Sequence, residues 1–225
     1  MNRIDFDIIG FDLDGTLVDS AEDLRNAANA ALQSIALPPL TREQIRPAIG
    51  GGARRMLALG IMLNGAGPPD DALIDRIFPV FLAHYEANLV ATTRPFARCE
   101  AALATLAAQG VLLAVVTNKL EAMAIRLLTE LAMADRFVTI IGRDSLGHGR
   151  AKPLPDPIFE MVRRCGGGRA AFVGDSSFDV DAAKAAGVPA IACRFGYPDR
   201  PVASLGADAI ISDYDELIPV LRALT

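Results

Sequence analysis

The chain has 225 residues, of which 52% are hydrophobic and 22% are charged, and its formal net charge is −5. This composition excludes an intrinsically disordered chain, and the negative charge argues against nucleic acid or an anionic membrane as a main partner. The three scattered cysteines and two histidines exclude a disulfide framework and a histidine-rich metal site, and no G-x-S-x-G signature of a serine hydrolase is present.

The first part of the chain predicts one strand followed by helices. The apolar run at residues 6–11 is typical of a buried parallel strand. Capping residues, alanine- and leucine-rich stretches and Pro or Gly stops then predict helices at residues 20–36, 41–47, 53–63 and 70–89. Ser20 is expected to cap the first helix, and Thr41 with Gln44 to form a capping box at the second, which Pro47 and the glycines at residues 50–52 should close.

From residue 95 onward, strands alternate with helices. Strands are predicted at residues 111–116, 137–141, 170–173, 190–193 and 209–211. Helices are predicted at residues 99–109, 122–131, 157–165, 182–186 and 214–224. This alternation favours a parallel sheet. We therefore predict an α/β fold with a doubly wound, Rossmann-like parallel-sheet core, formed by residues 1–18 and 95–225, and an inserted all-helical cap at residues 19–94.

Two carboxylates follow the first predicted strand. Asp12 and Asp14 are two residues apart, so on an extended chain they point to the same face. Two carboxylates at such a short distance repel each other unless a cation, typically a divalent metal ion, lies between them. Gly15 allows a sharp turn directly afterwards. The alternative is that this Asp-Gly pair is only a solvated hairpin turn.

Polar residues also stand where later strands end, and ligands of open α/β sheets bind at that edge. Thr117 and Asn118 follow residues 111–116, Asp175 and Asp179 follow residues 170–173, and Lys152 lies in a proline-rich turn. The acids can bind Mg²⁺, while the hydroxyl, amide and ammonium groups can bind phosphate oxygens. Each has an alternative: Thr117 as a helix cap, Lys152 as a solvated lysine, and Asp179 as an acid that favours a helix N-terminus.

Four segments together resemble the motifs of haloacid dehalogenase superfamily phosphatases. They are FDLDGTLVDS at residues 11–20, VVTN at residues 115–118, the turn around Lys152, and GDSSFDVDAAKAAG at residues 174–187. They extend over nearly the whole chain, and the helical block after the first motif resembles the cap of one subgroup. The resemblance implies a Mg²⁺-dependent phosphomonoester hydrolase that forms an aspartyl-phosphate intermediate.

Transferred residue by residue, the resemblance makes Asp12 the nucleophile, and Asp14 the general acid and then the general base. It implies that Thr117, Asn118 and Lys152 bind the phosphoryl oxygens. It also implies that Mg²⁺ is held by acids at the same strand ends: Asp12, Asp14 through its carbonyl, Asp175 and Asp179.

Within the superfamily, the sequence most resembles the phosphoglycolate phosphatases, through TLVDSAEDL, IGGGAR, the Lys-Pro-x-Pro-Asp-Pro turn and residues 194–197. This implies 2-phosphoglycolate as the substrate, although N-acetylmuramic acid 6-phosphate phosphatases share much of the pattern. In the cap, Gly51 belongs to a glycine loop able to approach the substrate, and Arg54 or Arg55 could bind its carboxylate. The alternative is that both arginines are solvated helix residues. Phe178 replaces a residue that is polar in many relatives and receives no role.

Other functions remain open at this point. A sugar-phosphate mutase would keep both acids, whereas a dehalogenase would not need Asp14. A phosphate- or metal-binding regulatory module is the alternative without catalysis. We expect a small phosphorylated metabolite as the partner, with no nucleic acid and no membrane, and leave monomer or homodimer undecided. Because no leader pattern and no uncharged run of about 18 residues are present, we expect a cytoplasmic protein.

Overall fold

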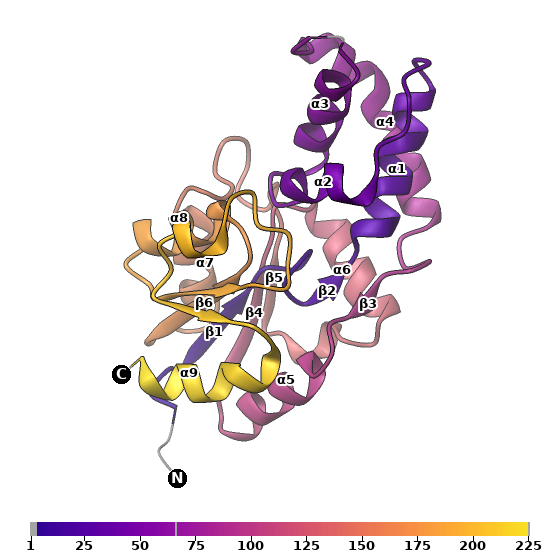
Figure 1. The fold of residues 1–225 in the computed structure, drawn as a ribbon. Coiled ribbons are helices and arrows are strands. Elements are labelled where there is room, and N and C mark those ends of the chain that lie inside the picture. Colours follow the sequence, from indigo (N-terminus) through magenta and orange to yellow (C-terminus); the bar gives the residue numbers. More distant parts are fainter. Residues whose placement is uncertain (1–3, 66, 225) are drawn as a thin grey trace.

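A computed structural model describes residues 4–65 and 67–224 of the chain. Its core is a sheet of six parallel strands in the order β5-β4-β1-β6-β7-β8 (Figure 1). The strands are β1 (Ile8–Phe11), β4 (Leu112–Val116), β5 (Thr139–Ile141), β6 (Ala170–Gly174), β7 (Ala190–Cys193) and β8 (Ala209–Ile211). The predicted doubly wound parallel sheet is therefore confirmed. Residues 1–3, part of the segment on which the expected absence of a leader depends, lie outside the described residues.

The first strand lies at the centre of this sheet. All four residues of β1 are buried, as expected for a strand that is covered on both faces. It pairs with β4 on one side and β6 on the other, with Phe11 opposite Val115 and Val173. The three strands therefore end together, and the segments that follow them meet at one edge of the sheet.

Helices cover both faces of the sheet, and neighbouring residues of β1 contribute to different sides. Ile9 and Phe11 pack in one hydrophobic cluster with residues of α5 (Cys99–Ala108), α6 (Glu121–Glu130) and α9 (Leu217–Ala223). Ile8 packs in the other with α7 (Asp156–Arg164) and α8 (Ser177–Ala185). Three short 3-10 helices complete the core: Ala134–Arg136, Val202–Ser204 and Tyr214–Glu216.

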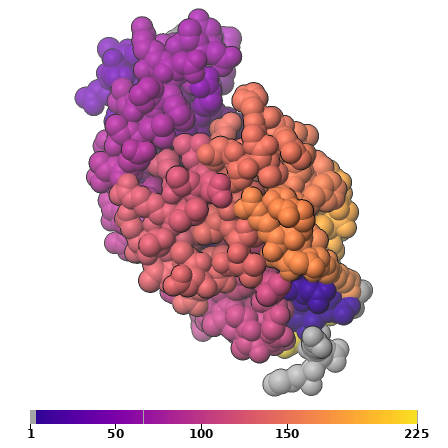
Figure 2. All heavy atoms as spheres, turned by 180° about the vertical axis from the view of Figure 1, so that it is seen from behind, coloured from indigo at the N-terminus to yellow at the C-terminus, as the bar shows by residue number. Residues whose placement is uncertain are grey.

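Four helices form a separate lobe beyond the carboxyl edge of the sheet (Figures 1 and 2). They are α1 (Ala21–Gln33), α2 (Arg42–Ile49), α3 (Ala53–Leu63) and α4 (Asp71–Ala87). The chain leaves and re-enters the core through an antiparallel pair of two-residue strands, β2 (Val18–Asp19) and β3 (Arg94–Pro95). The sequence did not reveal this pair, because two residues are too short for a periodic pattern. The proposed boundaries at 18/19 and 94/95 fall within it.

Two predictions about helix ends need correction, in addition to α8, which begins at Ser177 and not at residue 182. Ser20 does not cap α1 with its side chain; its hydroxyl donates to Asp14 Oδ1 at 2.6 Å instead. Pro47 does not close α2, which continues to Ile49 and ends at Gly50, the first residue of the predicted glycine stop. The missing N–H of a proline removes one hydrogen bond, while burial of Ile49 stabilises the last turn. The capping box of Thr41 with Gln44 is confirmed. Among the described residues, no helix has the length and apolar character needed to cross a membrane.

Candidate active site

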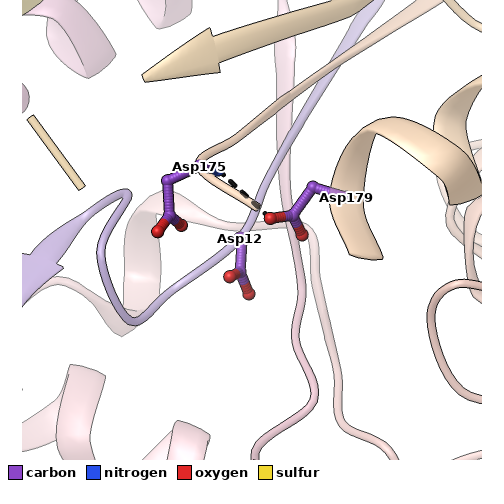
Figure 3. A group of neighbouring side chains, drawn as sticks. All are labelled: Asp12, Asp175 and Asp179. Carbon is purple, nitrogen blue, oxygen red and sulfur yellow. Dashed lines mark hydrogen bonds between the residues drawn. The ribbon is translucent and has the colours of Figure 1, made fainter. Parts of the chain in front are cut away.

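Three buried carboxylates lie together at the carboxyl edge of the sheet (Figure 3). Asp12 follows β1, Asp175 follows β6, and Asp179 lies in the first turn of α8. One ligand oxygen from each lies within 4.8 Å of those of the others. Gly15 turns the chain after β1 with φ of +89°, and a Cβ there would lie 2.4 Å from Asp175 Oδ2. A larger residue at position 15 would therefore displace this carboxylate.

Hydrogen bonds hold two of these carboxylates in place. Asp175 accepts from the Thr16 hydroxyl at 2.9 Å and from the Tyr197 N–H at 2.6 Å. Asp179 Oδ2 accepts from the N–H groups of Asp175 and Ser176 at 3.1 and 2.9 Å. Asp179 thus also stabilises the start of α8, as its structural interpretation predicts, while its role as a cation ligand stays a prediction.

The ammonium group of Lys152 contacts two of the three acids. Lys152 Nζ is 2.5 Å from Asp179 Oδ1 and 2.9 Å from Asp12 Oδ1. The second contact is an ion pair without hydrogen-bond geometry, because Asp12 Oδ1 has no hydrogen-bond partner within the described part of the chain. Lys152 is only 4% exposed, so the alternative of a solvated lysine is wrong.

The buried site carries more negative than positive charge. Burial raises the pKa of Asp12 to about 6, although Lys152 opposes this shift. Burial and the neighbouring Asp179 also raise the pKa of Asp175 well above its usual value. A divalent cation with a preference for oxygen ligands would remove this imbalance. The unbonded Asp12 oxygen and the all-oxygen donor set therefore fit Mg²⁺.

The second acid of the first motif points away from this cluster. Asp14 Oδ1 accepts from the Ser20 hydroxyl, and Lys119 Nζ lies 2.6 Å from Asp14 Oδ2. Lys119 also lies 4.7 Å from the centroid of the Tyr85 ring. Burial alone would lower the pKa of Lys119, but Asp14 raises it above its ordinary value. The sequence analysis assigned no role to Lys119, although it follows the predicted Thr117-Asn118 pair directly.

The predicted phosphate-binding residues surround the same edge. The Thr117 hydroxyl accepts from the Lys119 N–H at 3.2 Å, which closes a local turn and does not cap α6. Asn118 Nδ2 donates to the carbonyls of Gly50 and Lys152 at 3.0 and 3.2 Å. Asn118 therefore connects the helical lobe, the second motif and the Lys152 turn.

A cavity of about 580 Å³ separates the sheet edge from the helical lobe. Asp12 and Asp14 line its core side together with residues 117–119. Its other side is largely apolar and includes Met56, Phe78, Phe81, Leu82 and Tyr85. Such a space between a polar floor and an apolar roof is typical of a small-molecule site.

The two candidate substrate residues of the lobe lie differently relative to the cavity. Gly50 and Gly52 line the cavity, but Gly51 does not. Arg54 lines it, but its guanidinium is 2.6 Å from an oxygen of Asp75 and 3.1 Å from one of Asp71. These two carboxylates already compensate its charge. The neighbouring arginine, Arg55, instead places its guanidinium 5.1 Å from the centroid of the Phe178 ring, which joins α3 to α8.

The parallel sheet, the acids at its carboxyl edge and the helical lobe above them define a hydrolase of the haloacid dehalogenase type. The family model for haloacid dehalogenase-like hydrolases matches residues 9–193, and the chain belongs to this family.

Several relatives are similar over most of their length. The chain is 39% identical to the phosphoglycolate phosphatase of Mesorhizobium japonicum, over 93% of this chain and 92% of that protein. It is also 39% identical to that of Rhodospirillum rubrum, over 92% and 87% respectively. The crystal structure of a predicted phosphoglycolate phosphatase from Haemophilus somnus has a TM-score of 0.88 and 30% identity, over 96% of this chain and 98% of that one. The chain is thus a phosphatase of this family, and its partner is a small phosphorylated substrate.

Proposed function

We propose that this phosphatase hydrolyses 2-phosphoglycolate with Mg²⁺ and an aspartyl-phosphate intermediate on Asp12. One observation carries the proposal: of the three clustered acids, only Asp12 also lines the cavity. It can therefore contact a substrate phosphorus in the cavity and also contribute to the cation site. The names of the relatives support 2-phosphoglycolate as the substrate. The cytoplasmic location expected from the sequence stays a prediction.

The proposed reaction has two steps. Asp12 attacks phosphorus, the bond from phosphorus to the ester oxygen breaks, and Asp14 gives its proton to that oxygen. Asp14 then removes a proton from the water molecule that attacks the phosphorylated Asp12, which releases phosphate. Thr117, Asn118 and Lys152 would hold the phosphoryl oxygens during both steps.

The cation would reduce repulsion between the attacking carboxylate and the phosphate dianion. The residues that would hold it are Asp12, the Asp14 carbonyl, Asp175 and Asp179. Ser20 and Lys119 keep the Asp14 carboxylate directed away from this group. The two acids of the first motif can therefore have different roles although they are only two residues apart.

The size of the cavity favours a second candidate substrate. A volume of about 580 Å³ lies in the range of sites for drug-sized ligands, and 2-phosphoglycolate would fill only a small part of it. A larger acidic ester, such as N-acetylmuramic acid 6-phosphate, would use more of the apolar surface formed by Phe78, Phe81 and Leu82.

A phosphate-release screen separates these possibilities. The purified protein with Mg²⁺ is assayed with 2-phosphoglycolate, N-acetylmuramic acid 6-phosphate, several sugar phosphates and p-nitrophenyl phosphate. The highest kcat/KM is expected for 2-phosphoglycolate. A higher value for another ester would overturn the substrate assignment, and isomerised sugar phosphate without phosphate release would indicate a mutase. No turnover of any ester would favour a binding module.

A further inference from the structure

Lys119 is a buried cation in the cavity that orients Asp14 in the proposed chemistry. It follows β4, its side chain is only 5% exposed, and it lines the cavity. Its Nζ lies 2.6 Å from Asp14 Oδ2. An ammonium group has three N–H donors, and this contact uses one of them. Lys119 can therefore bind a second acceptor without releasing Asp14.

The chemistry of the proposed substrate places its second charged group close to this lysine. In 2-phosphoglycolate, a single CH₂ group separates the ester oxygen from the carboxylate. Asp14 must contact the ester oxygen to protonate it. A cation that contacts Asp14 is therefore within reach of the substrate carboxylate. A cation that is already paired with acids of α4 is not available to bind it.

The helical lobe contributes a second, independent observation. Tyr85 of α4 is 1% exposed and lines the cavity beside Lys119. Its hydroxyl is buried and has no hydrogen-bond partner among the described residues. A buried polar group without a partner destabilises the protein. An oxygen-bearing ligand in the cavity would satisfy this hydroxyl.

Arg54, a candidate taken from the sequence, has different surroundings. It stands opposite two acids, Asp71 and Asp75, within 3.1 Å. The local charge of this group is negative, which disfavours an additional carboxylate. Its side chain is also 35% exposed, so water would weaken any charge contact there.

We propose that Lys119 from the core and Tyr85 from the helical lobe together form the subsite for the substrate carboxylate. The inference rests on the proposed function and specifies how it is achieved. The subsite would select esters in which one carbon atom separates the carboxylate from the phosphoester oxygen. 3-(Phosphonooxy)propanoate, which has two such carbons, should be a poorer substrate.

The test compares 2-phosphoglycolate with 2-hydroxyethyl phosphate, an analogue of similar size in which an uncharged CH₂OH group replaces the carboxylate. The readout is the ratio of their kcat/KM values, because a change that only misplaces Asp14 lowers both values equally. Lys119→Met should lower this ratio about tenfold to hundredfold, and Tyr85→Phe about twofold to tenfold. Lys119→Arg should retain most of it. Arg54→Ala is the matched control and should leave the ratio unchanged.

Each outcome has a distinct meaning. An unchanged ratio in Lys119→Met would show that this lysine only positions Asp14 and would overturn the inference. A large fall in Arg54→Ala would return the carboxylate contact to α3 and would also overturn it. Tyr85→Phe removes one oxygen, so it tests the subsite even if a Lys119 variant fails to fold. If the wild-type protein does not prefer 2-phosphoglycolate, the proposed function fails instead.

Discussion

The sheet edge and the cavity face of the helical lobe hold their charged groups in different ways. At the sheet edge, Lys152 and Asp179 have side chains only 1% exposed and are 2.5 Å apart. On the lobe, Arg54 pairs with Asp71 and Asp75, whose side chains are 95% and 64% exposed. Removal of one partner of a buried ion pair strongly destabilises the folded protein, whereas exposed ion pairs contribute little to its stability. We therefore expect substitutions of charged residues to be poorly tolerated at the sheet edge. On the lobe, substitutions of exposed charged residues should leave the reaction intact.

The largest expected effect comes from the residue shared by the acid cluster and the cavity. Asp12→Asn should reduce phosphate release about 10⁴-fold or more, because the amide cannot serve as the nucleophile. Asp181→Asn is the matched control, since Asp181 is an exposed acid of α8 that lies 3.8 Å from Arg200. Activity close to wild type in a folded Asp12→Asn protein would contradict the assignment.

Removal of the cation should affect the sheet edge almost as strongly. Excess EDTA is expected to abolish phosphate release and added Mg²⁺ to restore it, whereas Ca²⁺ should inhibit because its coordination is larger and less rigid. Mg²⁺ should also raise the Tm of the wild-type protein but have less effect on Asp175→Asn. Full activity in EDTA would show that the acid cluster does not need a cation.

Loss of the hydrogen bonds that connect the core to the start of the lobe should have an intermediate effect, which is on stability. The Tyr197 hydroxyl accepts from the N–H groups of Ser20 and Ala21 and donates to Asp19 at 2.5 Å. Tyr197→Phe leaves these groups without this partner and should lower the free energy of unfolding by about 1–3 kcal/mol. Tyr214→Phe, which removes a hydroxyl bonded to the Thr16 carbonyl, should cost less. Urea unfolding measures both, and equal losses would contradict a special role of the connection.

The smallest effect is expected on the lobe. Arg54→Ala should change the free energy of unfolding by less than about 1 kcal/mol, because both of its ion pairs are partly exposed. Its kcat/KM for 2-phosphoglycolate should stay within about twofold of wild type. A tenfold loss of kcat/KM would instead support Arg54 as the contact of the substrate carboxylate. It would also show that the lobe contributes to the reaction as the sheet edge does.

Much of the sheet edge was predictable from the sequence because its determinants are local. The apolar run before Asp12 specifies a buried strand, and a residue that follows such a strand reaches the ligand-binding edge in any open parallel sheet. The same reasoning placed Asp175 and Asp179 after β6. The capping box of Thr41 with Gln44 was also predictable, because both partners lie within one helical turn.

Only the tertiary structure decided which partner each polar group takes. Ser20 stands where a helix cap is expected, yet its hydroxyl donates to Asp14, which the turn at Gly15 brings near, and makes no capping hydrogen bond with the backbone of α1. Lys119 and Tyr85 are separated by more than thirty residues, and no local pattern indicates that the lobe brings them together over Asp14. Hydrogen bonds and ion pairs act over a few ångströms in space, so such partners become visible only after the chain has folded.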